Sequence, residues 1–261
     1  MRRIVLMSLM LSFAIQPASL ARSRKSPETV AVGQVASVVD GDTVRLESGS
    51  QIRLTGIQAS KLPLGRRGFR AWPLSKESKT FLERLALNRA VSLRYDGRRI
   101  DRHGRLLVHL YDNKNRWVQG EIIARGMARV YGFPDNRSRT AGLLALERKA
   151  RAARWGIWKH RFYRILESDE TSGFMCTFQL VEGRVMSPAA VLGWGYLNFG
   201  ENWRTDFTIS ISPRSRRSFK RDGLMIKSYK SHILRVRGWL KSFNGPMMET
   251  THPEQIEVLE E

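Results

Sequence analysis

Three short motifs hold the residues whose types are best suited to chemistry. They are Asp40-Gly41-Asp42-Thr43, Ile52-Arg53-Leu54-Thr55-Gly56-Ile57 and Asp101-Arg102-His103-Gly104-Arg105. Carboxylates suit divalent cations, because calcium takes about six to eight oxygen ligands and favours charged ones. The planar fork of an arginine matches two oxygens of a phosphate. These residue types are the ones that metal and phosphate chemistry need, although Asp-Gly-Asp-Thr alone is also a good turn.

The charge of the chain points to a polyanionic partner. Among 261 residues, 45 are Lys or Arg and 24 are Asp or Glu, which gives a net charge of +21 at pH 7. Such a balance favours nucleic acid or an anionic membrane surface over a small neutral ligand. The hydrophobic fraction of 42% excludes a disordered chain. Residues 22–170 hold 31 basic and 15 acidic residues, against 12 and 9 in residues 171–261, so the first part faces the polyanion.

The N-terminus reads as an export signal. Residues 1–21 combine Arg2 and Arg3, an apolar run and small residues before a cut after Ala21. The run is short for a membrane span, and the other interpretation is an uncleaved N-terminal anchor. We therefore predict export to the periplasm or the medium, with no transmembrane span in the mature chain. The single cysteine, Cys176, has no intramolecular partner and is expected to be a small core residue.

We expect a small β-barrel with helices packed against it to position these motifs. Alternating apolar residues predict strands over residues 29–39, 43–46, 51–57, 90–95 and 106–111. Apolar residues at helical spacing predict helices over residues 76–88, 117–125 and 140–154, the first with Ser75 as N-cap. The predicted fold class is mainly β with helices, an OB-fold-like β-barrel.

A second small domain is expected after a polar, acidic stretch at residues 167–173. The division is 22–167 for the first domain and 174–261 for the second. Five segments predict an all-β second domain whose spacing suits another OB-like barrel, namely 178–185, 195–199, 207–211, 232–239 and 256–259. Residues 213–221 carry five cations and are expected to be a hairpin tip, either touching phosphates or serving solubility.

Five motifs in order and spacing resemble the thermonuclease (staphylococcal nuclease-like) family over about residues 30–160. They are the three motifs above, with Gly126-Met127-Ala128 and Gly156-Ile157-Trp158. The resemblance implies an OB-type five-stranded barrel with helices, and a nuclease that acts with calcium. It also implies that Asp42 is a metal carboxylate and that Arg53 and Arg105 clamp the phosphate as its charge develops.

The match fails at one loop, where family members typically read G-[IV]-D-[AT]-P-E. Here the stretch is Gly56-Ile57-Gln58-Ala59-Ser60-Lys61. Gln58 replaces a metal Asp and Lys61 replaces the general-base Glu, so the calcium site is incomplete and the enzyme activity is in question. Acidic residues nearby that could rescue activity are Asp40, Asp101 and Glu77.

Three interpretations of Lys61 stay open. Its amine could act as a base with a depressed pKa beside Arg53 and Arg105. Its ammonium could turn toward Asp42, take over part of the role of the metal and hold a phosphate with the two arginines. Its side chain could instead lie in solvent on a mobile loop.

Aromatic and basic residues suggest how nucleic acid is held. Tyr131 lies where family members stack a nucleotide base, and its other interpretation is packing in a surface loop. Residues 64–72 interleave cations and aromatics, so Arg66 and Arg67 are predicted to bind nucleic acid unless the loop is simply solvated. This composition suits a single strand of DNA or RNA.

The sequence thus predicts an exported nucleic-acid-binding protein of the thermonuclease-like family. Phosphodiester hydrolysis is expected to be weak, altered or absent. The alternative is a catalytically inactive pseudo-nuclease that serves as an envelope or interaction module.

Overall fold

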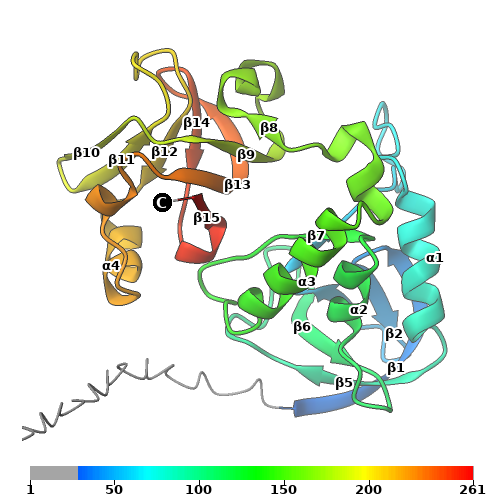
Figure 1. The fold of residues 1–261 in the computed structure, drawn as a ribbon. Helices are drawn as coiled ribbons and strands as arrows, with labels where there is room; N and C mark the ends of the chain where they lie inside the picture. Colours follow the sequence, from blue (N-terminus) through cyan, green and yellow to red (C-terminus); the bar gives the residue numbers. More distant parts are fainter. Residues whose placement is uncertain (1–28, 261) are drawn as a thin grey trace, which may run out of the picture.

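The computed structural model of the protein describes residues 29–260. The predicted signal peptide at residues 1–21 lies outside the described residues. Figure 1 shows two bodies, a barrel with helices and a sheet formed by the C-terminal part of the chain. The predicted class, mainly β with helices, is confirmed. No helix within residues 29–260 has both the length and the apolar character needed to cross a membrane.

The first body is a closed five-stranded barrel with the strand order β1-β2-β3-β6-β5. Its strands are β1 (Thr29–Asp40), β2 (Thr43–Leu46), β3 (Gln51–Leu54), β5 (Ala90–Arg94) and β6 (Leu106–Tyr111). Neighbouring strands are antiparallel except β3 and β6, which are parallel. All five strands contribute buried apolar side chains to one core.

The predicted third strand over residues 51–57 is interrupted. β3 ends at Leu54, and the chain turns through Gly56, whose φ of +82° is readily adopted only by glycine. It continues as β4 (Ile57–Ala59), which pairs outside the barrel with β7 (Ala128–Val130). The sequence pattern did not predict β7, because three residues are too few to show a period.

Three helices cover the barrel, namely α1 (Ser75–Ala86), α2 (Val118–Ala124) and α3 (Thr140–Ala152). The prediction of Ser75 as the N-cap of α1 is wrong. Ser75 is the first helical residue and is buried, and Leu74 precedes it in the left-handed conformation without a side-chain cap. Short 3-10 turns follow at η1 (Gly156–Lys159), η2 (Arg161–Tyr163) and η3 (Ser168–Phe174).

The second body is an eight-stranded sheet with its own core. It consists of β8 (Leu166–Glu167), β9 (Phe178–Arg184), β10 (Ser187–Val191), β11 (Trp194–Asn198), β12 (Thr208–Ile211), β13 (Ile233–Ser242), β14 (Pro246–Glu249) and β15 (Ile256–Glu260). The order β10-β11-β12-β14-β13-β9-β8, with β15 also on β13, has two free ends. The sheet is therefore open, in contrast to the second barrel that strand spacing suggested. The division at residues 167–173 stays a prediction.

Residues 213–221 form a helix instead of the expected hairpin tip. In α4 (Pro213–Arg221), the Ser212 side chain accepts a hydrogen bond from the Ser215 amide, Pro213 occupies the first turn and Phe219 is buried. The Ser-Pro pair is a helix-start signal that the charge run obscured. The remaining 3-10 turns are η4 (Ile226–Tyr229) and η5 (Pro253–Gln255). The expectation that Cys176 lies in the core is also wrong, because its side chain is exposed.

A buried arginine joins the two bodies. Arg237 of β13 is 2% exposed, and its guanidinium lies 2.7 Å from Glu147 of α3 and 2.6 Å from Glu257 of β15. Arg151 of α3 contacts the same two carboxylates. The guanidinium of Arg237 also donates to the Val130 carbonyl at 3.4 Å. Because a buried cation needs paired anions and acceptors, these contacts hold β13 against α3 and β7.

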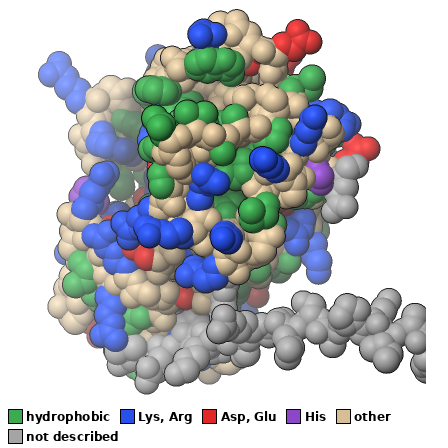
Figure 2. All heavy atoms as spheres, turned by 90° about the vertical axis from the view of Figure 1, so that its left-hand side faces the viewer, with side chains coloured by type: hydrophobic (Ala, Val, Ile, Leu, Met, Phe, Trp, Pro, Cys, Tyr) green, Lys and Arg blue, Asp and Glu red, His purple; other side chains and the backbone are tan. Residues whose placement is uncertain are grey.

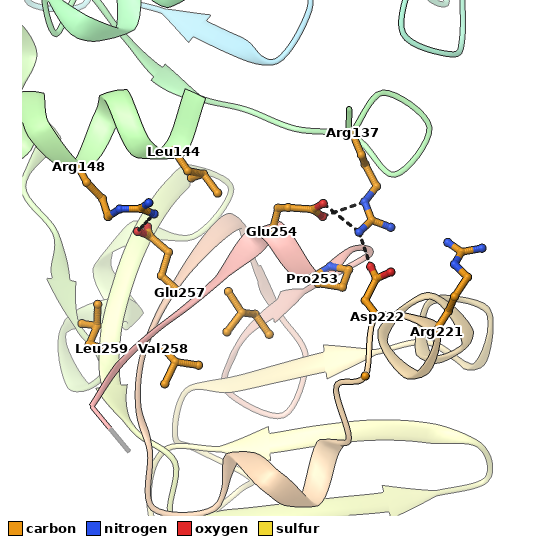
Figure 3. A pocket seen from close by; sticks show the side chains of 12 residues that line it. Arg137, Leu144, Arg148, Arg221, Asp222, Pro253, Glu254, Glu257, Val258 and Leu259 are labelled. Atoms are coloured by element: carbon orange, nitrogen blue, oxygen red, sulfur yellow. Dashed lines mark hydrogen bonds and ion pairs between the residues drawn. The ribbon is translucent and has the colours of Figure 1, made fainter. Parts of the chain in front are cut away.

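A second set of ion pairs lies beside the first (Figure 3). Arg137, in the loop before α3, donates to Glu254 at 2.8 Å and 2.9 Å and to Asp222 at 2.5 Å. Arg148 of α3 lies 3.6 Å from Glu257. Both bodies therefore contribute charges of opposite sign to one interface.

We expect Arg237→Met to lower the free energy of unfolding by about 3–5 kcal/mol, because it leaves Glu147 buried with less compensation. Urea unfolding at pH 7 measures this change. Lys241→Met is the matched control, since Lys241 is on the same strand and pairs with Glu249 in an exposed position. That variant should change the free energy of unfolding by less than about 1 kcal/mol. Equal effects of the two substitutions would contradict a structural role for the buried pair.

Candidate functional site

The Asp40-Gly41-Asp42-Thr43 motif contains a fully buried carboxylate. Asp42, at the turn between β1 and β2, accepts hydrogen bonds from Lys61 Nζ at 2.7 Å and 2.9 Å and from the Ala59 amide at 2.7 Å. Nη1 of Arg53 lies 3.3 Å from Oδ1 of Asp42. Burial raises the pKa of Asp42, but Arg53, Lys61 and these hydrogen bonds outweigh burial and hold the pKa far below its usual range.

A second carboxylate shares the same lysine. Asp40 Oδ2 lies 3.4 Å from Lys61 Nζ, and Asp40 Oδ1 accepts from the Asp42 amide at 3.1 Å. Burial and then the charge of Asp42 raise the pKa of Asp40. Of the three interpretations of Lys61, the geometry matches the one in which its ammonium turns toward Asp42. Lys61 is not a solvated loop residue.

The direction of Lys61 depends on how its loop is anchored. Ser60 and Tyr163 share a hydrogen bond of 2.5 Å between their hydroxyls, and the Tyr163 hydroxyl donates to the Pro73 carbonyl at 2.9 Å. The Trp72 amide donates to the Lys61 carbonyl at 2.9 Å. Both ends of the loop over residues 61–72 are thus attached to η2 and to each other. Sequence reasoning missed Ser60 and Tyr163, because the two residues are far apart in the chain.

The two predicted arginines line one cleft of about 850 Å³. Arg53 of β3 is fixed by donating to the carbonyls of Leu54 at 2.7 Å and Ile57 at 2.6 Å. Arg105 is bound to Asp101, with its Nε and Nη2 atoms at 2.8 Å and 2.7 Å from Asp101 Oδ2. The ion pair of Arg105 was not foreseen. It arises because Asp101 forms the turn before β6, where it also accepts from the Arg105 amide at 3.0 Å.

The side chain of Gln58 is engaged away from Asp42. Its Oε1 accepts a hydrogen bond from Arg129 Nε at 2.9 Å, and both side chains are buried. The Arg129 guanidinium lies over the rings of Phe178 at 4.5 Å and Trp72 at 5.7 Å. Burial lowers the pKa of Arg129 to about 10. The side-chain amide of Gln58 is therefore the hydrogen-bond acceptor of a buried guanidinium.

The residues present do not fit the calcium that the family implies. Both oxygens of Asp42 are bound by the Lys61 ammonium, and Gln58 faces Arg129. A calcium ion needs several oxygen ligands within about 2.6 Å, and a cation of the protein already lies on the carboxylate that would anchor it. Within residues 29–260, no three His, Cys, Asp or Glu side chains form a group that could hold a metal. Of the remaining acidic residues, Glu77 lies exposed in the first turn of α1.

Of the residues predicted to bind nucleic acid, Arg66 and Tyr131 line the cleft and Arg67 does not. Arg66 lines the cleft, with its guanidinium 3.7 Å from the centre of the Phe69 ring. Arg67 is exposed and is not part of the lining. Tyr131 lines the cleft as well, but its ring contacts Phe178 at 4.8 Å and its hydroxyl accepts from Trp239 Nε1 at 2.9 Å.

The cleft also contains residues to which the sequence patterns assigned no role. Arg98 and Arg102 contribute further cations, and Trp239 reaches the cleft from the C-terminal sheet. For the two arginines the basic composition of residues 98–105 was a usable signal. For Trp239 there was none, because no pattern relates it to a barrel about a hundred residues earlier.

The closed five-stranded barrel is the fold that the resemblance to the staphylococcal nuclease-like family implies. Residues 51–160 match the family described as staphylococcal nuclease homologue. The chain is 26% identical over 128 residues to the thermonuclease of Staphylococcus hyicus, which covers 49% of this chain and 75% of that protein. It is 29% identical over 148 residues to an uncharacterized protein of Methanocaldococcus jannaschii, covering 48% of this chain and 70% of that protein. The resemblance of residues 51–160 to the staphylococcal nuclease-like family is thus confirmed.

We expect Lys61→Met to lower the free energy of unfolding at pH 7 by about 3 kcal/mol, because one of two cations on a buried carboxylate is lost. Asp42 stabilises the fold above its ordinary pKa of 3.8, and this stabilisation is lost as the pH falls. The difference between wild type and variant should therefore shrink below about pH 4. Lys79→Met, in a partly exposed i, i+4 pair with Glu83, is the control and should change little. A difference that grows on acidification would contradict this account.

Proposed function

We propose that the cleft binds the phosphodiester backbone of nucleic acid, and that calcium-assisted hydrolysis has been lost or altered in this chain. The observation that carries the proposal is the Lys61 ammonium on both oxygens of Asp42. This ammonium supplies positive charge beside Arg53 without a bound metal. Binding of a phosphate then needs no divalent cation.

The charges around the cleft support an anionic ligand. Its lining holds three carboxylates, Asp40, Asp101 and Asp135, and twice as many cations, Arg53, Lys61, Arg66, Arg98, Arg102 and Arg105. Basic side chains also outnumber acidic ones in Figure 2, which views the molecule from the side where β10, β11 and α4 lie in Figure 1. A net positive cleft on a protein of +21 attracts a polyanion over distances of about a Debye length.

The same pairing favours a second candidate, a catalytically inactive pseudo-nuclease that acts as an interaction module. Gln58 is bound to Arg129, and within residues 29–260 no three His, Cys, Asp or Glu side chains form a group that could hold a metal. Export of the protein is part of the proposal for both candidates and depends on residues 1–21. A nucleic-acid binding assay distinguishes the two, since only the first candidate requires that the cleft bind nucleic acid.

We expect the affinity for a single-stranded oligonucleotide to be the same in calcium and in chelator. The affinity should fall with salt, with a log–log slope of about −2 or steeper if three or more phosphates are neutralised. Fluorescence anisotropy measures both dependences. Arg105→Ala should weaken binding, whereas Lys241→Ala, an exposed residue of the other body, should not. Binding that requires calcium, or that ignores salt, would overturn the proposal.

The double substitution Gln58→Asp with Lys61→Glu tests why hydrolysis is lost. It removes the ammonium from Asp42 and returns two carboxylates and a candidate base to the loop. Calcium-dependent cleavage of denatured DNA should rise by about 10² to 10⁴. Adding Arg105→Ala should abolish the gain, because phosphate charge is then no longer clamped. Efficient calcium-dependent cleavage by the wild type, reduced by the double substitution, would show that the base lies elsewhere.

A further inference from the structure

We infer that Trp239 of the C-terminal sheet and Phe133, which follows β7 in the barrel body, form a nucleobase platform at the cleft, and that the ligand is single-stranded. This inference rests on the proposed function. Trp239 of β13 is 43% exposed and Phe133 is 46% exposed, and both line the cleft that contains Arg53 and Arg105. Large aromatic side chains that remain this exposed beside a cluster of cations are available to a ligand.

Tyr131 joins the two exposed rings and holds them in place. Its hydroxyl accepts the hydrogen bond from Trp239 Nε1 at 2.9 Å, and its ring meets the Phe133 ring edge-on at a centroid distance of 5.0 Å. Phe178 covers Tyr131 from the C-terminal sheet at 4.8 Å. Tyr131 is thus a positioning residue, and the free ring surface belongs to Trp239 and Phe133. This differs from the expectation that Tyr131 itself stacks a base.

The interface between the two bodies sets the position of Trp239. Side chains two residues apart on a strand point to the same face, so Arg235, Arg237 and Trp239 share the face of β13 that meets the barrel. Arg237 is bound to Glu147 of α3, and Trp239 follows it by two residues. Because the ion pair of Arg237 with Glu147 fixes β13 against α3, the indole of Trp239 lies beside Tyr131 at the edge of the cleft.

The arrangement of rings and cations matches a single strand. The Trp239 N–H is already satisfied by Tyr131, which leaves the apolar face of the indole for stacking. Cations from the barrel, including Arg102 and Arg105, line the same cleft and can neutralise phosphates. A nucleobase has an accessible face only where it is not stacked within a duplex. A duplex would therefore meet the cations without using the platform.

Trp239→Ala tests the platform, using a thymidine oligonucleotide, a duplex of the same length and an abasic oligonucleotide of the same charge. We expect affinity for the thymidine strand to fall about 5- to 150-fold, as for the loss of one stacked base. Affinity for the duplex and for the abasic strand should change less than about 2-fold, because both lack an accessible base. Trp239→Phe should retain most of the affinity, since it keeps a stacking ring.

Trp203→Ala is the matched control. Trp203 has a similar exposure of 46% and belongs to the same body, but it lines a different cavity, with Tyr196 and Phe243. This variant should bind all three ligands like the wild type.

The possible failures can be told apart. If the wild type binds none of the three nucleic acids, the proposed function is overturned and this inference with it. If the wild type binds but Trp239→Ala leaves the thymidine strand unaffected, only the platform is overturned. An equal loss for the abasic strand also overturns it, because the effect would then come from a disturbed interface.

Discussion

The Asp42 carboxylate has no exposure to solvent, and the arrangement of the cleft follows from the need to compensate its charge. An unpaired buried carboxylate would cost several kcal/mol, so cations and amide donors must reach it. Arg53 comes from β3, the Ala59 amide from β4 and Lys61 from the following loop. One buried charge thereby ties together the barrel, the short outer sheet and the loop that borders the cleft.

The two departures from the nuclease-like pattern form one consistent change. The Lys61 ammonium binds the oxygens of Asp42 that a metal ion would need. The side-chain oxygen of Gln58 accepts a hydrogen bond from Arg129. A carboxylate at position 61 beside Asp40 and Asp42 would add a third negative charge to a buried site. The ammonium instead balances the charge, so a metal is not required to keep the site folded.

A second buried charge determines how the C-terminal sheet sits on the barrel. Arg237 of the C-terminal sheet bridges Glu257 of the same sheet and Glu147 of α3, so its ion pairs cross between the two bodies. The ion pairs of Arg137 with Glu254 and Asp222 reinforce the same contact. As a result the cleft has walls from both bodies. The C-terminal sheet is therefore part of the candidate site as well as an addition to the fold.

Local pattern in the sequence determined the barrel strands at residues 43–46 and 106–111. Such features follow from neighbouring residues, whose period and turns can be read along the chain. The resemblance to the nuclease-like family predicted one site for Arg53 and Arg105, and both residues line the same cleft. Tertiary structure alone decided that Lys61 binds Asp42, that Asp101 binds Arg105 and that Trp239 joins Tyr131. A long side chain can reach several partners, and the choice among them depends on which charges and hydrogen-bonding groups the fold buries nearby.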